Sequence, residues 1–109
     1  MIMTLKYKGE ATIDIFIADS YFKRLIGYMF RKQPHHSAIL FTPCNNIHTF
    51  FMKFNIDVLF LDEHMQVIKK IESLRPGKVV TMVMGAKMVI ESEEGILAYI
   101  KEGDTLDLF

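Results

Sequence analysis

The chain holds one cysteine, Cys44, and a histidine, His48, follows it four residues later in the stretch PCNNIHTFF. A thiol becomes a strong nucleophile when a nearby base or cation lowers its pKa. A histidine can serve as that base when a third group orients its ring, and Asp57 in FNIDVLF is a candidate for that role. The three residues could therefore form a cysteine–histidine hydrolase or transferase. Because free cysteine is also among the most buried residue types, we favour a structural or ligand-lining role for Cys44.

Asp57 stands in an apolar run, where a carboxylate is costly unless it has a partner. The candidate partners are Arg24, Lys53, His48 and backbone amides. A structural ion pair or a hydrogen bond to the backbone is the simpler interpretation, and a carboxylate lining a pocket beside His48 is the functional one. Arg24 could face solvent or reach inward to Asp57 or Glu91. Gly27 would allow helix and sheet to approach closely, which favours the inward direction.

Metal and cofactor sites are not expected. A zinc site needs three or four ligands with compatible geometry, and the chain offers one cysteine and four histidines. His35, His36 and His64 stand in polar stretches typical of solvated loops. The sequence has no phosphate-binding glycine loop, no serine-centred elbow and no RNA-binding aromatic signature.

Bulk composition indicates one globular domain over residues 1–109. Thirteen basic residues balance thirteen acidic ones, so no nucleic-acid partner is expected. No apolar run approaches the roughly 20 residues that span a bilayer, and the start of the chain lacks a signal-peptide pattern. We therefore expect a cytoplasmic protein with no membrane partner. One cysteine allows no internal disulfide, and the composition does not set the oligomeric state.

The element pattern predicts an α+β fold that is mainly β. Apolar alternation and β-prone runs indicate about seven or eight short strands, and helical spacing indicates one or two short helices. The nine candidate segments for these strands are 4–10, 11–18, 38–42, 47–52, 56–62, 66–73, 79–84, 86–91 and 105–109, and Phe50, Phe51, Phe54 and Phe60 are expected in the core. Helices are expected in 19–30, over about ten residues, and in 92–104, where Ser92 would cap the N-terminus. A curled antiparallel, barrel-like sheet with a helix packed on it fits these elements best.

Several segments together resemble the DUF192 family, a group of small prokaryotic proteins. They are RLIGYMFR, AILFTPCNNIHTFFMKFNIDVLFLD, LRPGK, GAKMVIESEEGI and EGDTLDLF, from about Arg24 to the C-terminus. The positions that match the family pattern are Arg24, Gly27, Cys44, His48, Thr49, Met52, Asp57, Asp62, Glu91, Gly95, Gly103 and Asp104. Asn55, where a proline is usual, and Gly77, where an aromatic is common, depart from it. The resemblance implies a small β-rich fold in a bacterial protein, without agreed catalytic residues.

Three functions fit these observations, and we rank them binding, interaction, enzyme. A non-enzymatic binding module would hold a small polar ligand at one rim of the sheet. Its candidate ligand-binding residues are Arg24, Cys44, His48, Thr49, Asp57 and Glu91. A protein-interaction domain would instead expose an apolar patch. An enzyme would need the side chains of Cys44, His48 and Asp57 within hydrogen-bond reach of one another, and Cys44 at least partly exposed.

Overall fold

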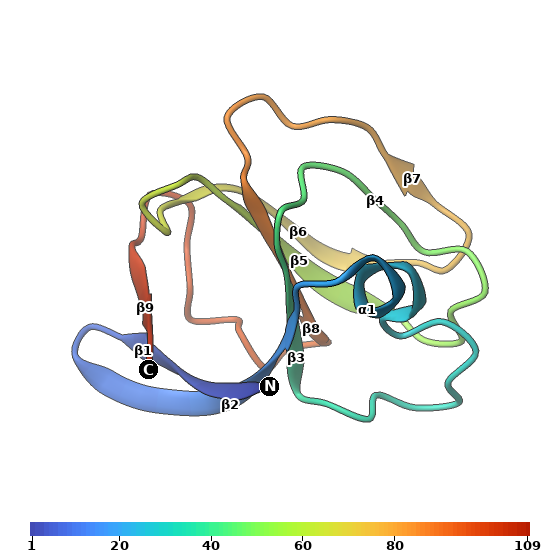
Figure 1. Ribbon diagram of the computed structural model, residues 1–109, viewed down its shortest axis with the longest axis horizontal. Helices are drawn as coiled ribbons and strands as arrows, with labels where there is room; N and C mark the ends of the chain where they lie inside the picture. Colours follow the sequence, from blue (N-terminus) through green and yellow to red (C-terminus); the bar gives the residue numbers. More distant parts are fainter.

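A curled seven-stranded sheet forms the body of the protein (Figure 1). The computed structural model describes the backbone of residues 1–109 and all side chains except those of Tyr21, Phe22 and Leu25. The sheet order is β6-β5-β8-β3-β2-β1-β9. The bounds are β1 (Ile2–Tyr7), β2 (Glu10–Ala18), β3 (Ala38–Phe41), β5 (Ile56–Leu61), β6 (Val67–Leu74), β8 (Met88–Glu93) and β9 (Leu106–Leu108). A second sheet pairs β4 (Ile47–His48) with β7 (Val79–Val80), and the helix is α1 (Tyr21–Ile26).

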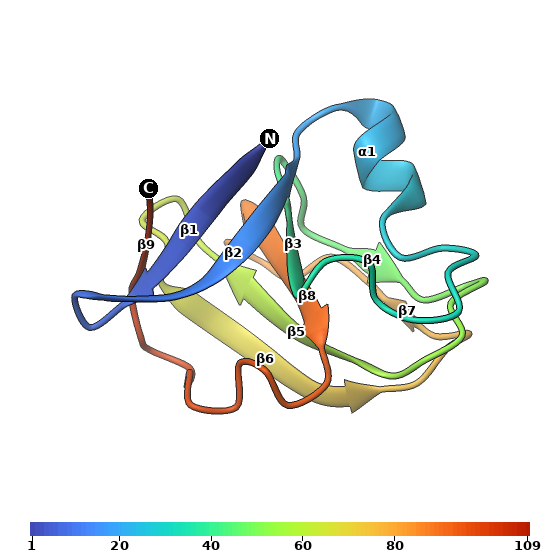
Figure 2. The same cartoon turned by 90° about the horizontal axis from the view of Figure 1, so that it is seen from below.

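The predicted barrel-like sheet is confirmed, with one parallel pair among its antiparallel neighbours. β2 runs parallel to β3, because α1 and the following loop carry the chain back between them. The two ends of the sheet meet at a bridge between Gln66 and Thr105, where the Leu106 amide donates to the Met65 carbonyl at 3.0 Å. These contacts bring β6 and β9 together (Figure 2). No helix among the described residues is long and apolar enough to cross a membrane.

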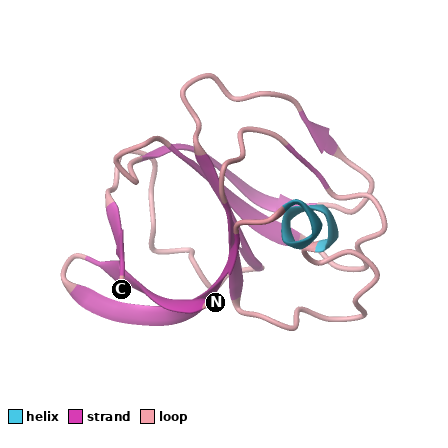
Figure 3. Ribbon diagram, viewed as in Figure 1, coloured by secondary structure: helices cyan, strands magenta, loops and turns pink.

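The central strands β3, β5 and β8 bury both of their faces. Successive side chains of a strand point to opposite sides of a sheet, and in β5 Leu59 joins the core inside the curl while Val58 and Phe60 join a second core outside it. The outer core includes residues of β4 and of the loops around β4 and β7. Figure 3 shows α1 and these loops on the same side of the curled sheet. All six residues of β5 are buried, so this apolar run is covered on both faces of the sheet.

Helix α1 is shorter than predicted, with six residues where about ten were expected. Ser20 caps its start, since its hydroxyl accepts a hydrogen bond from the Lys23 amide at 3.3 Å. Gly27 ends it with φ +44°, a conformation that L side chains rarely adopt. A Cβ at Gly27 would lie 2.9 Å from Cζ of Phe41. The predicted close approach of helix and sheet is confirmed.

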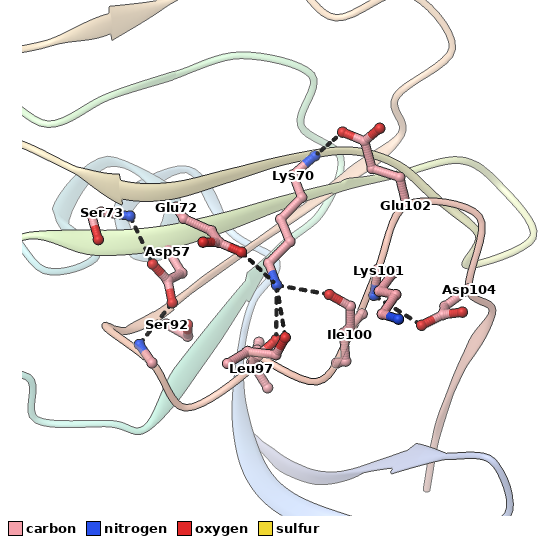
Figure 4. Close-up of polar contacts among 12 residues, drawn as sticks. Asp57, Lys70, Glu72, Ser73, Ser92, Leu97, Ile100, Lys101, Glu102 and Asp104 are labelled. Carbon is pink, nitrogen blue, oxygen red and sulfur yellow. Dashed lines mark hydrogen bonds and ion pairs between the residues drawn. The ribbon is translucent and has the colours of Figure 1, made fainter.

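The predicted helix over 92–104 is wrong. Ser92 lies buried in β8, and the residues after β8 form a series of turns. The Lys70 ammonium on β6 donates to the carbonyls of Leu97 (3.2 Å), Ala98 (3.3 Å) and Ile100 (2.7 Å) (Figure 4). These carbonyls are thus satisfied from β6 without a helix. Gly95, at φ +87°, leaves the helical region at the start of the segment.

The predicted strands over 47–52 and 79–84 shrink to two residues each. Phe51 has φ +64°, which ends the extended backbone after β4. As a consequence Phe50 and Phe51 are 43% and 64% exposed, so their predicted place in the core is wrong. Phe60 is fully buried and Phe54 is partly buried against the outer core, as predicted.

Candidate functional site

A pocket of about 560 Å³ opens on the outer face of the sheet, between α1, the segment joining β3 to β4, and β8. It brings together four of the six predicted ligand-binding residues: Arg24, Cys44, His48 and Glu91. Thr49 and Asp57 do not line it. The volume is in the range of pockets that take small organic ligands.

Glu91 forms a buried wall of the pocket. It lies two residues after Val89 on β8, so both side chains point to the outer side of the sheet. Only 2% of Glu91 is exposed, and its Oε1 has no hydrogen-bond partner among the described residues. Burial raises the pKa of this carboxyl from 4.5 to about 8. A buried polar atom without a partner is rare in folded proteins and calls for an explanation.

Arg24 lines the same pocket from the last turn of α1. Its Nη1 donates to two backbone carbonyls, of Asp19 at 3.4 Å and Thr42 at 3.3 Å. Among the described side chains no ion pair includes Arg24, so the inward alternative of a pair with Asp57 or Glu91 is not formed. A guanidinium has five N–H donors, and several remain for a ligand.

Cys44 lies after the cis bond between Thr42 and Pro43, partly buried. Its thiol donates to the Asn46 carbonyl at 3.0 Å. Burial raises the pKa of the thiol, and the Glu91 carboxyl raises it further, while the bond to Asn46 and the Arg24 charge act in the opposite direction. The net rise keeps Cys44 a neutral thiol at physiological pH, which is the reverse of an activated nucleophile.

His48 lines the same pocket as Cys44, but its ring nitrogen bonds to the backbone. Its Nδ1 accepts a hydrogen bond from the Phe50 amide at 3.2 Å, and its ring stacks on the Phe50 ring at 5.3 Å between centroids. A neutral histidine that accepts at Nδ1 carries its proton on Nε2. Within the part of the chain whose side chains are described, no hydrogen bond joins Cys44 to His48. In this arrangement His48 offers a donor rather than a base.

Asp57 and Thr49 bond to the backbone of other segments. Asp57 accepts from the Ser73 amide at 2.9 Å and from the Gly95 amide at 2.7 Å (Figure 4), which fits the simpler interpretation of this residue. It pairs with Ser92 across the sheet, one position from Glu91, and so points to the opposite face. Thr49 is fully buried, and its hydroxyl donates to a carbonyl of the 75–78 turn at 2.7 Å.

Lys87 also lines the pocket, although it is not among the predicted ligand-binding residues. Lys87 precedes β8 and lies four residues before Glu91, an even spacing that puts both side chains on one side of an extended chain. The even spacing of Lys87 and Glu91 within the expected strand over 86–91 is a signal in the sequence that points to Lys87. Among the described side chains no group of three or more histidine, cysteine, aspartate or glutamate residues could hold a metal ion.

Comparisons with known proteins agree with the resemblance. A UPF0127 protein of Pyrococcus horikoshii is 34% identical over 96% of this chain and 92% of its own length. Two crystal structures match at low identity, of a protein of unknown function from Novosphingobium aromaticivorans (TM-score 0.79, 17% identity, 98% of this chain, 84% of that one) and of a protein from Sinorhizobium meliloti (TM-score 0.81, 18% identity, 98% and 92%). These two likenesses show the fold alone.

The sequence matches determine the family of this chain. The curated relatives are archaeal, so the bacterial source expected for this chain stays a prediction. The family model DUF192, described as "Uncharacterized ACR", matches residues 3–108. The chain belongs to the DUF192 family.

Proposed function

We propose that this protein is a binding module for a small polar ligand, held in the pocket between α1 and β8. One observation carries the proposal: the Glu91 carboxyl is 2% exposed, lines the pocket, and has an oxygen without a partner among the described residues. Leaving a buried oxygen unpaired costs about 1–3 kcal/mol. A ligand that donates a hydrogen bond to Glu91 would remove this cost.

The Cys44 and His48 geometry supports binding over catalysis. A nucleophilic cysteine needs a base that can take its proton. The Cys44 proton instead points to the Asn46 carbonyl, and the His48 ring accepts from a backbone amide. Both side chains therefore serve as polar walls of the pocket.

We also propose a cytoplasmic location and no nucleic-acid partner, supported by the single cysteine and the net charge of zero.

A titration of the labelled protein with a small-molecule library, followed by backbone amide NMR, tests the proposal. A ligand is expected to shift amides of pocket residues such as Cys44 and Glu91. The variant Glu91→Gln should weaken binding at least tenfold, whereas Glu10→Gln, a matched change at an exposed site on β2, should leave it unchanged. The proposal fails if no library member shifts the pocket amides, or if both variants bind like the native protein.

A second candidate, a protein-interaction domain, is favoured by one surface feature. Phe30 and Phe51 are 66% and 64% exposed, and their rings stack at 5.2 Å between centroids beside the pocket-lining residue Met29. Exposed aromatic pairs are common in interfaces. Sedimentation velocity over a range of concentrations tests self-association. Association lost in Phe51→Ser would support this candidate, and a monomer at all concentrations would contradict the self-association form of it.

A further inference from the structure

The described charged groups and the histidine that line the pocket include several hydrogen-bond donors but one carboxyl. Glu91 is the one carboxyl among its described lining residues, whereas Arg24, Lys87 and the Nε2–H of His48 are donors. Glu91 and Arg24 are not within ion-pair distance, although both line the pocket with Cys44 and both act on the pKa of its thiol. A ligand can bridge such a gap if it carries a donor at one end and an anionic acceptor at the other.

The donor end is best supplied by an ammonium group. A buried carboxyl without a partner gains most from a group that brings both hydrogen bonds and the opposite charge. The anionic end is best supplied by a carboxylate, because a guanidinium matches its two oxygens in a planar fork. An α-amino acid carries an ammonium and a carboxylate on one short backbone, so a single molecule offers a donor to Glu91 and an acceptor to Arg24.

Part of the pocket lining is apolar. Phe41 and Met52 are 4% and 7% exposed in the outer core, and Ile26 forms part of the rim. An aliphatic or aromatic side chain would gain by burial against them, at roughly 25 cal/mol per Å² of apolar surface removed from water. Methionine also adapts its shape to such a neighbour.

We propose that the ligand is an α-amino acid with an apolar side chain, its ammonium on Glu91, its carboxylate on Arg24, and its side chain against Phe41 and Met52. The inference rests on the proposed function and narrows it to one class of ligand. A free amino acid and the N-terminus of a peptide share the ammonium. They differ in the neighbouring carboxylate, and Arg24 therefore distinguishes them.

Three matched probes test the inference, with dissociation constants measured by amide NMR titration. They are L-phenylalanine, L-phenylalaninamide, which lacks the carboxylate, and 3-phenylpropionate, which lacks the ammonium. Phenylalanine is expected to bind at least tenfold more tightly than either analogue. Glu91→Gln should remove its advantage over 3-phenylpropionate, and Arg24→Gln its advantage over the amide. Both variants are first checked for a native amide spectrum.

The native protein alone decides the test, even if a variant fails to fold. Equal binding of 3-phenylpropionate would refute the ammonium contact, and equal binding of phenylalaninamide would refute the carboxylate contact in favour of a peptide N-terminus. In either case the proposed function stands, because a ligand still occupies the pocket. If the three probes leave the pocket amides unshifted, the amino-acid inference is refuted, and the library titration separately decides the proposed function.

Discussion

The ionisation of Glu91 should make the protein less stable as pH rises. Burial raises the pKa of this carboxyl from 4.5 to about 8 in the folded protein. Between these values the unfolded chain has lost the proton while the folded protein still holds it. The folded state then binds more protons, so the free energy of unfolding falls with pH. At about 1.4 kcal/mol per unit, a shift of this size corresponds to roughly 5 kcal/mol.

The variant Glu91→Gln isolates this contribution, since glutamine has the same shape and no charge. Urea unfolding of both proteins at pH 5, 6, 7, 8 and 9 gives the difference in their free energies of unfolding. Near pH 5 the two should be similar. At pH 8 and above the variant should be the more stable protein, by several kcal/mol.

Other groups titrate in the same range but cancel in the difference. Burial lowers the pKa values of His35 and His36, which makes both proteins less stable as pH falls below about 6.5. Glu10→Gln, at an exposed site, supplies the matched control and should follow the native protein at every pH. Parallel curves for native protein and Glu91→Gln would show that the carboxyl is solvated or paired, and would refute the reasoning.

Four further predictions concern single residues. Asp57→Ala leaves two backbone amides without their acceptor and should cost about 1–3 kcal/mol in urea unfolding; an unchanged midpoint would mean that the carboxylate is solvated. Phe60→Ala removes a fully buried ring and should cost roughly 3–5 kcal/mol, and a loss well under 1 kcal/mol would contradict its place in the core. Gly27→Ala puts a Cβ against Phe41 at a positive φ and should cost about 1–3 kcal/mol, whereas a stabilised variant would show that the helix end rearranges. Alkylation of Cys44 should have a midpoint above pH 9.0, and a midpoint well below 8 that His48→Ala abolishes would restore the catalytic interpretation.

The sequence predicted best those strands whose own residue pattern specifies an extended, buried conformation. β5 is a continuous apolar run, and a run of that kind fits a strand buried on both faces. The segment after β8 could not be predicted in the same way. Its carbonyls are satisfied by Lys70, which lies about 30 residues earlier in the chain. Local helix signals such as Ser92 carry no information about such a distant partner.

The candidate site shows the same division. Arg24, Cys44, His48 and Glu91 were selected from the family pattern and from their chemistry, and the fold brings them to one pocket. Asp57 matched the same pattern but points to the other face, where two backbone amides hold it. A position that matches the family pattern can therefore stabilise the fold or line the pocket. The direction of the side chain in its strand separates these roles, and sequence alone did not fix the register.

Glu91 is the residue at which the needs of the fold and those of the pocket disagree. Its neighbours Val89 and Ile90 are fully buried, and an apolar side chain at position 91 would continue that pattern. Other carboxyls on the sheet are exposed or bonded, as Asp57 is. Glu91 weakens the fold at neutral pH and has no structural partner among the described side chains. Such residues are typical of functional sites, where activity is retained at a cost in stability. If Glu91→Gln is the more stable protein at pH 8 and also the weaker binder, the two measurements together show that this carboxyl lowers the free energy of unfolding and is needed for ligand binding.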